Sequence, residues 1–331
     1  MREPRVRSDV TVALLPLLCL VLVAALLKLL LASGWAARIA MDLPNERSLH
    51  AVPIPRIGGI VLVAVALGAC AVVAPALRPV LLIAAALAIV SAWDDRHGLP
   101  VLFRFAVHLA AAAGAVGLLR VDAPVWLMVA LALLLTWAMN LYNFMDGSDG
   151  LAGGMALFGF GALGLAAMGS APGVGLACLC IAAAAGGFIW HNFHPARVFL
   201  GDAGSIPLGF LAGSLGVAGW AQGLWPAWFP LLVFSPFVVD ASVTLAARLL
   251  RGQKPWQAHR EHVYQRMVAG GLGHRRTALL WYALMAACAA TALVGLRLSA
   301  TQQWALVAGW TVIYGILAAV TTRRYPLPNK S

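Results

Sequence analysis

Charge is the scarcest property of this chain. Only 11% of its 331 residues are Asp, Glu, Lys or Arg, whereas 62% are hydrophobic and the mean hydropathy is +0.88. So little charge excludes an ordinary soluble globular protein. On so apolar a chain, the net charge of +11 indicates contact with anionic lipid headgroups rather than with nucleic acid. The composition therefore predicts a polytopic membrane protein.

Apolar runs recur along the whole sequence, and a helix needs about 20 such residues to cross a bilayer. They predict an all-α polytopic membrane protein with about eleven transmembrane helices. No linker, low-complexity tract or internal repeat divides the chain, so residues 1–331 are expected to form one integral membrane domain. The predicted helices are 10–31, 57–76, 79–93, 101–119, 125–141, 151–168, 173–190, 205–220, 226–249, 277–297 and 302–321.

Three common signatures are missing. The five cysteines all fall inside apolar runs without metal-ligand or redox spacing, so they are predicted to pack in the interior. No glycine-rich loop ends in Gly-Lys-Ser or Gly-Lys-Thr, which argues against nucleotide hydrolysis of the P-loop type. The first apolar run is too long for the core of a cleavable signal peptide, so it is expected to remain as a helix.

The loops divide into two sets, one for each side of the membrane. Sixteen Lys and Arg lie in or beside the loops that follow odd-numbered helices, against six on the other side. This excess predicts that the first set is cytoplasmic, although Arg2, Arg5 and Arg7 before the first helix favour the reverse. Eight of the twelve acidic residues lie in the same set of loops. We therefore expect an active site at the cytoplasmic face.

The first two of these loops bring basic residues and an acid pair to that face. Arg47, His50 and Arg56 lie in a segment rich in Pro and Gly, which is either a solvated connector or a rigid phosphate-binding loop. Asp94 and Asp95 follow the third apolar run directly. Two adjacent carboxylates at a membrane boundary are costly unless water or a cation balances them.

The next two loops add amides and further carboxylates. Asn140, Asn143, Asp146 and Asp149 recur every third residue, which places them on one helix face if the stretch stays helical. Such a face either packs against another helix or binds a ligand. Asp202, in the sequence Gly-Asp-Ala-Gly-Ser, offers a carboxylate for a divalent cation beside backbone N–H groups that can face a phosphate.

The fifth loop is long and basic. His259 and His262 are three residues apart, but no cysteine or further histidine completes a zinc site nearby, so contact with phosphate is favoured, supported by Arg260 and Arg266. Asp240 lies inside the ninth apolar run, where a carboxylate is a functional candidate. Pairing with an arginine at the end of that helix is the structural alternative.

Asp94, Asp95, Asp146, Asp149 and Asp202 are predicted to converge, because their loops share one face of the membrane. Mutual repulsion and partial desolvation oppose their ionisation, and a divalent cation relieves both effects. Oxygen ligands favour Mg²⁺, with Mn²⁺ as the other possibility, shared with substrate phosphates. Such a site suits phosphoryl transfer, in which the protein positions the reactants and stabilises charge. The lipid boundary suggests a lipid phosphate as one substrate.

Taken together, the motifs resemble those of the polyprenyl-phosphate N-acetylhexosamine-1-phosphate transferases, the glycosyltransferase family 4 enzymes related to phospho-N-acetylmuramoyl-pentapeptide transferase. The matching segments occur in the family's order over nearly the whole chain. They are Asp42-x-Pro-Asn-x-Arg-x-x-His50, Pro55-Arg-x-Gly-Gly59, Asp94-Asp95, Asn143-Phe-Met-Asp-Gly-x-Asp-Gly-Leu-Ala-Gly153, Phe199-Leu-Gly-Asp-Ala-Gly-Ser205 and His259-x-x-His262-x-Tyr-Gln-Arg266.

The resemblance implies that a polyprenyl phosphate, usually undecaprenyl phosphate, attacks the β-phosphate of a UDP-linked N-acetylamino sugar and releases UMP. It implies a Mg²⁺ ligand at Asp202, activation of the lipid phosphate by the acid pair, and phosphate contacts from the two histidines. The predicted catalytic residues are Asp94, Asp95, Asp146, His259 and His262; the predicted substrate-binding residues are Arg47, His50, Arg56, Asn143, Asp149, Asn192, Phe199, Arg260 and Arg266; the predicted metal ligands are Asp202 and Asp94.

The branch of the family is indicated by two loops. The Pro-Asn-x-Arg first loop and the His-x-x-His last loop differ from those of the muramoyl-pentapeptide enzymes, so the O-antigen-initiating branch is favoured. Its donors include UDP-GlcNAc, UDP-FucNAc and UDP-QuiNAc. The resemblance also implies the bacterial inner membrane and a possible homodimer. Direct attack and an aspartyl intermediate both remain open.

Two other classes of protein compete with this interpretation. A membrane aromatic prenyltransferase also uses acidic sites and Mg²⁺, but would not need the Gly-Asp-Ala-Gly-Ser loop. A cation-coupled transporter would place its ionisable residues near the middle of the bilayer, whereas here most acids lie at one face.

Overall fold

The computed structural model describes residues 13–42, 44, 52–119, 123–254, 257 and 259–327. In this part of the chain the β-structure is limited to one antiparallel pair of two-residue strands, so the all-α class is confirmed. The elements are α2 (Leu15–Ala32), α3 (Trp35–Ile39), β1 (Met41–Asp42), β2 (Ile54–Pro55), α4 (Gly58–Val73), η1 (Pro75–Leu77), α5 (Arg78–His97), α6 (Val101–Leu118), α7 (Val125–Phe144), α8 (Leu151–Ala167), α9 (Pro172–Asn192), α10 (Asp202–Ala221), α11 (Trp228–Val233), α12 (Ser235–Leu250), α13 (Val263–Met267), η2 (Val268–Leu272), α14 (Gly273–Gly295) and α15 (Ala300–Arg324).

Each predicted apolar run has a helical counterpart in the structure. Eight helices in the described part of the chain are long and apolar enough to cross a membrane. Two shorter apolar helices, α4 and α8, have 16 and 17 residues. The polytopic membrane class is therefore confirmed, while the exact number of eleven spans stays a prediction.

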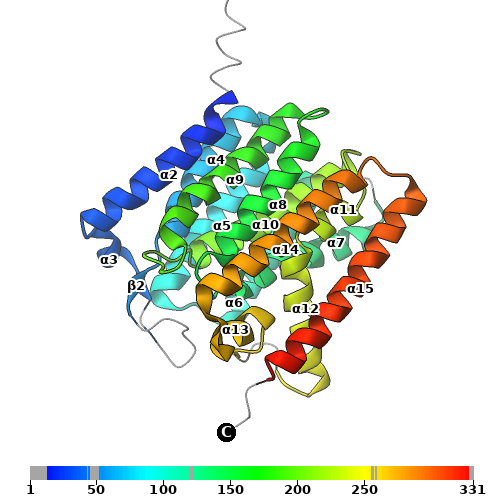
Figure 1. The fold of residues 1–331 in the computed structure, drawn as a ribbon. Helices are drawn as coiled ribbons and strands as arrows, with labels where there is room; N and C mark the ends of the chain where they lie inside the picture. The colour runs from blue at the N-terminus through cyan, green and yellow to red at the C-terminus, as the bar shows by residue number, and fades with distance from the viewer. Residues whose placement is uncertain are drawn as a thin grey trace, which may run out of the picture.

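The ninth predicted helix, 226–249, is not continuous. It is divided at Phe234 into the short α11 and the longer α12. Pro236 is the second residue of α12. A proline has no N–H to donate to the preceding turn and its ring clashes with the carbonyl four residues back, so an unbroken helix is disfavoured here. The break gives α12 a direction of its own beside α14 (Figure 1).

The central helix of the bundle is α10, which is buried along nearly its whole length and contacts α4, α5 and α7 (Figure 1). Glycine allows this close packing. A Cβ on Gly209 would lie 2.5 Å from the carbonyl oxygen of Ala138 in α7, so a larger residue would push the two helices apart. The first residue of this central helix is Asp202, which therefore enters the site on a rigid element.

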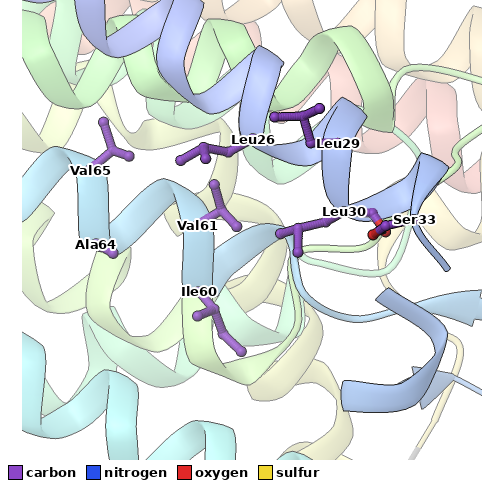
Figure 2. A pocket seen from close by; sticks show the side chains of 8 residues that line it. All are labelled: Leu26, Leu29, Leu30, Ser33, Ile60, Val61, Ala64 and Val65. Carbon is purple, nitrogen blue, oxygen red and sulfur yellow. The ribbon is translucent and has the colours of Figure 1, made fainter. Parts of the chain in front are cut away.

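The outer helices expose apolar side chains, as expected where a helix faces lipid. The last helix, α15, buries only Trp310 and stands at one side of the bundle (Figure 1). Between α2 and α4 the surface forms an apolar groove of about 460 Å³ whose lining includes Leu29, Leu30, Ile60 and Val61 (Figure 2).

Candidate active site

Four carboxylates meet where the ends of three helices come together. Asp94 and Asp95 occupy the last turn of α5, Asp202 begins α10, and Asp146 lies in the turn that follows α7. The predicted convergence of these residues is what the structure shows, because the charges of Asp95, Asp146 and Asp202 act on one another directly.

Arg104 joins two of these carboxylates. Its Nη1 lies 2.9 Å from Asp94 Oδ2 and 3.6 Å from Asp202 Oδ2. The other oxygen of Asp94 accepts a hydrogen bond from the backbone N–H of Leu99. The sequence-based prediction missed Arg104, although an arginine in the first turn of a mostly apolar helix, α6, is a signal that could have identified it.

Arg56 forms an ion pair with Asp95, the second acid of the pair. It follows β2, and its guanidinium contacts Asp42 in β1 at 2.8 Å and Asp95 at 3.6 Å. Burial opposes its charge, but the carboxylates of Asp42, Asp95 and Asp202 outweigh burial and raise the pKa of Arg56 above its usual value. The backbone N–H of Ala203 donates to Asp95 Oδ2 at 3.3 Å. The small strand pair thus holds a permanent cation beside the acid pair.

Asn143 connects α7 to the start of α10. Its Nδ2 donates to Asp202 Oδ1 at 2.8 Å and also lies 3.1 Å from Ser205 Oγ. The expected polar face of residues 140–149 is not a helix face, because α7 ends at Phe144. The chain unwinds there, so Asp146 and Asp149 lie in the turn before α8 rather than on a helix.

Asp146 is half-buried among other acids. Burial first, and then the negative charges of Asp202 and Asp95, raise the pKa of Asp146 well above its usual range, while Arg56 and the backbone N–H of Gly201 oppose that shift. A carboxyl group in such a position favours the approach of a further positive charge.

Two glycines bring the first loop against the Gly-Asp loop. The N–H groups of Gly58 and Gly59 donate to the carbonyl oxygens of Phe199 and Leu200, both at 2.9 Å. A Cβ on Gly59 would lie 2.4 Å from the Cα of Gly204. These glycines permit the close approach of another backbone segment.

Asp149 belongs to a separate polar cluster with two histidines. Its Oδ2 lies 2.6 Å from His194 Nδ1 and its Oδ1 lies 3.7 Å from His274 Nδ1. The two imidazole rings are parallel, with centroids 5.4 Å apart. Asn192 holds this region together, since its side chain accepts from Gly150 N at 2.8 Å and donates to Val198 O at 2.9 Å. Neither histidine was predicted, because no spacing links residues so far apart.

The basic loop forms a third cluster. His259 and His262 lie with ring centroids 4.9 Å apart. Burial, followed by the positive charges of His262 and Arg248, lowers the pKa of His259 to about 4. The alternative pairing of Asp240 with an arginine at the end of its helix is not found, since Arg248 bonds to Glu261 at 2.7 Å.

Arg266 is held by the C-terminal segment. Its Nη1 donates to the carbonyl oxygen of Tyr325 at 2.8 Å, so at least part of its guanidinium secures the chain after α15. Arg260 lies in the described loop, whereas the predicted residues Arg47 and His50 lie outside the described residues.

The donor chemistry of the four carboxylates fits a divalent cation. Among the residues that the structure describes, no three His, Cys, Asp or Glu side chains form a compact metal-binding group. Arg104 Nη1 nevertheless contacts both Asp94 and Asp202, so the two carboxylates face a common position that carries positive charge. Hard oxygen donors around such a position are what Mg²⁺ requires.

Comparison with known proteins gives a consistent result. The sequence profile of glycosyl transferase family 4 matches residues 77–219, which include the acid pair, the amide-rich turn and the Gly-Asp loop. The decaprenyl-phosphate N-acetylglucosaminephosphotransferase of Mycobacterium tuberculosis (strain H37Rv) is 28% identical, over 86% of this chain and 83% of the relative.

Two further relatives carry similar names. The probable undecaprenyl-phosphate N-acetylglucosaminyl 1-phosphate transferase of Bacillus subtilis is 27% identical over 73% of this chain and 74% of its own. The undecaprenyl-phosphate alpha-N-acetylglucosaminyl 1-phosphate transferase of Yersinia pestis is 29% identical over 81% and 80%. The motifs occur in the family's order and the acids gather at one site, so over residues 77–219 the chain is similar to glycosyl transferase family 4.

Proposed function

We propose that this protein transfers an N-acetylamino-sugar 1-phosphate from a UDP-sugar to a polyprenyl phosphate, giving a polyprenyl-diphospho-sugar and UMP. The observation that carries the proposal is the group of four carboxylates, Asp94, Asp95, Asp146 and Asp202, braced by Arg104 at the end of an apolar bundle. Acids and arginines together suit a reaction in which several phosphate charges are brought close and held in line.

The proposed reaction is a displacement at phosphorus. An oxygen of the lipid phosphate forms a bond to the β-phosphorus of the UDP-sugar, and the bond from that phosphorus to the bridging oxygen breaks. UMP leaves with the bridging oxygen and the electron pair. We assign Asp94 and Asp95 to activation of the lipid phosphate. We assign Arg56, which already lies 3.6 Å from Asp95, to stabilisation of the negative charge of the phosphates.

Mg²⁺ belongs in this proposal, with Mn²⁺ as a substitute. We assign its ligands to Asp202 and Asp94, and when bound it would neutralise phosphate charge and polarise the β-phosphoryl oxygens. Asn143 orients Asp202 through the hydrogen bond at 2.8 Å. Arg104, which contacts both carboxylates, would move aside or share them with the cation.

The donor's uridine is assigned to the second cluster. We place the uracil beside Phe199 and its imide edge toward Asp149, with Asn192 holding the backbone on either side of that position through Gly150 and Val198. His259 and His262, with Arg260, are assigned to the diphosphate. Because the named functions of all three relatives involve N-acetylglucosamine, UDP-GlcNAc is the first donor to test, before UDP-FucNAc and UDP-QuiNAc.

The lipid substrate is supported by the apolar groove between α2 and α4 (Figure 2). The part of its lining that α4 supplies begins at Ile60, four residues after Arg56, so an isoprenoid chain lying there would bring its phosphate toward Arg56. Undecaprenyl phosphate is the proposed acceptor, the cytoplasmic face of the bacterial inner membrane the proposed location, and the start of O-antigen or another envelope polysaccharide the proposed role. A homodimer remains part of the proposal.

The test uses purified protein in detergent with undecaprenyl phosphate, Mg²⁺ and a panel of UDP-amino sugars, and follows UMP. The proposal predicts UMP from one donor only when lipid phosphate is present, its loss with EDTA, and its return with excess Mg²⁺ or Mn²⁺. Folded protein that releases no UMP from any donor would contradict the proposal.

A further inference from the structure

The fold buries one carboxylate that the reaction just described does not use. Asp240 lies in the second turn of α12, with only 2% of its side chain exposed. An ionisable group at such a position is costly unless it is paired or hydrogen-bonded. Its Oδ1 accepts from the backbone N–H of Val263 at 2.9 Å and from Thr244 Oγ1 at 3.1 Å, and its Oδ2 accepts from Tyr264 N at 3.3 Å.

The imidazole of His262 faces the same carboxylate. Its Nδ1 lies 3.4 Å from Asp240 Oδ1, and the side chain is 4% exposed. This buried nitrogen has no hydrogen bond within the described part of the protein. The ring lies between Phe144, with centroids 6.2 Å apart, and Tyr264, at 5.9 Å. Because the two nitrogens of an imidazole point in different directions, Nε2 is turned away from the carboxylate that Nδ1 faces.

Tyr264 connects the pair of Asp240 and His262 to the site of the four carboxylates. Its hydroxyl donates to the carbonyl oxygen of Phe144 at 2.9 Å. A Cβ on Gly147 would lie 2.3 Å from the same hydroxyl oxygen, so a larger residue there would displace the hydroxyl. The turn that bears Asp146 therefore rests on α13, whose first two N–H groups are held by Asp240.

We propose that Asp240 is a positioning residue that acts through His262: its carboxylate orients the imidazole, so that Nε2 is presented to the diphosphate of the donor. This inference rests on the proposed function and adds to it a residue that contacts no substrate. A carboxylate behind a histidine fixes the ring's tautomer and orientation, as carboxylate–histidine pairs do in other enzymes.

The competing explanation is purely structural, with Asp240 serving only as the cap of α13. The two explanations differ in how the effects of substitutions combine. If Asp240 acts through His262, removing the histidine first removes most of what Asp240 contributes. If the carboxylate only caps the helix, its loss costs the same factor whether or not the histidine is present.

The experiment is a double-mutant cycle with Asp240→Asn, His262→Gln and the double variant, measured as kcat/KM for the UDP-sugar donor. Asparagine keeps the shape of the side chain and one carbonyl oxygen but removes the charge. Each single variant is expected to lose about 10–100-fold, whereas Asp240→Asn in the His262→Gln background should change kcat/KM by less than about threefold. Ser242→Ala, on the same helix but bonded to Trp137, is the control and should keep wild-type activity.

Other results would overturn the inference. Equal losses from Asp240→Asn in both backgrounds, or full activity of either single variant, would exclude positioning through His262. Elution as a single species in size exclusion and the melting temperature establish folding; if Asp240→Asn fails that check, Asp240→Glu, which keeps the charge but moves it, replaces it in the same cycle. An inactive wild-type protein would contradict the proposed function itself, whereas an active wild-type protein with an additive cycle would contradict only the role of Asp240.

Discussion

Asn143 donates a hydrogen bond of 2.8 Å to the carboxylate of Asp202, and so joins the last turn of α7 to the first residue of α10. The two residues are 59 positions apart in the sequence. The bond orients the carboxylate that we assign to the metal and gives a neutral side chain a measurable role in the site.

Replacing Asn143 with Ala should lower kcat/KM by about 10–100-fold, because the partner that orients a metal-binding carboxylate is lost. UMP release per mole of folded protein measures the effect. Asn140→Ala is the matched control: one turn earlier on the same helix, Asn140 bonds to Thr136 O at 2.7 Å. It should change stability more than activity, and equal losses in both variants would contradict a specific role for Asn143.

Replacing Asp202 with Asn should reduce the rate on the order of 10³-fold, since the contribution of a bound cation to the transition state is several kcal/mol. The amide keeps the size of the side chain but removes the charge that holds the cation. The same variant should need a higher Mg²⁺ concentration than the wild-type protein to reach half of its own maximal activity. Full activity with unchanged Mg²⁺ dependence would show that Asp202 is not a metal ligand.

Replacing Gly59 with Ala should lower the free energy of unfolding by about 1–3 kcal/mol, because the added methyl group meets the backbone of α10 at Gly204. Activity should fall as well, since the movement displaces Asp202. Gly68→Ala in the same helix is the control, because a Cβ there meets nothing within 4 Å. Melting temperatures in detergent distinguish the two variants. If both variants melt at the temperature of the wild-type protein, the close approach of α4 and α10 is wrong.

His259 should make stability depend on pH below neutrality. Its pKa in the folded protein is about 4, against a usual value of 6.5, so the unfolded chain binds the proton more readily. Between these values stability should therefore rise with pH, and it should be lost as pH falls from about 6.5 toward 4. Melting temperature measured across this range should have a smaller slope in His259→Gln than in the wild-type protein. Equal slopes in the two proteins would contradict this role of His259.

The sequence predicted the membrane class, the positions of the helices and the meeting of Asp94, Asp95, Asp146 and Asp202. These succeed because the length of an apolar run and the side on which a loop emerges are local properties. Asp149 was predicted to join these four carboxylates, but it lies in a separate cluster with His194 and His274. The same reasoning missed the break at Phe234, although Pro236 beside it is a known signal against a continuous helix.

The partners of the charged residues could not be predicted in the same way. Arg104 reaches Asp94 and Asp202 because α5, α6 and α10 pack together. Arg266 bonds to the main chain at Tyr325, and nothing in the spacing of these residues indicates that contact. Such pairings depend on which helices become neighbours, which composition and periodicity leave open.

The most direct test of the proposed reaction follows the β-phosphate. UDP-GlcNAc labelled with ³²P at the β-position is incubated with the purified protein, undecaprenyl phosphate and Mg²⁺, and lipids are extracted into organic solvent. Transfer of sugar 1-phosphate predicts label in the extracted lipid and unlabelled UMP in water, in equal amounts. Label that stays in water as UDP while sugar reaches the lipid would contradict the account, because only the sugar would then have moved.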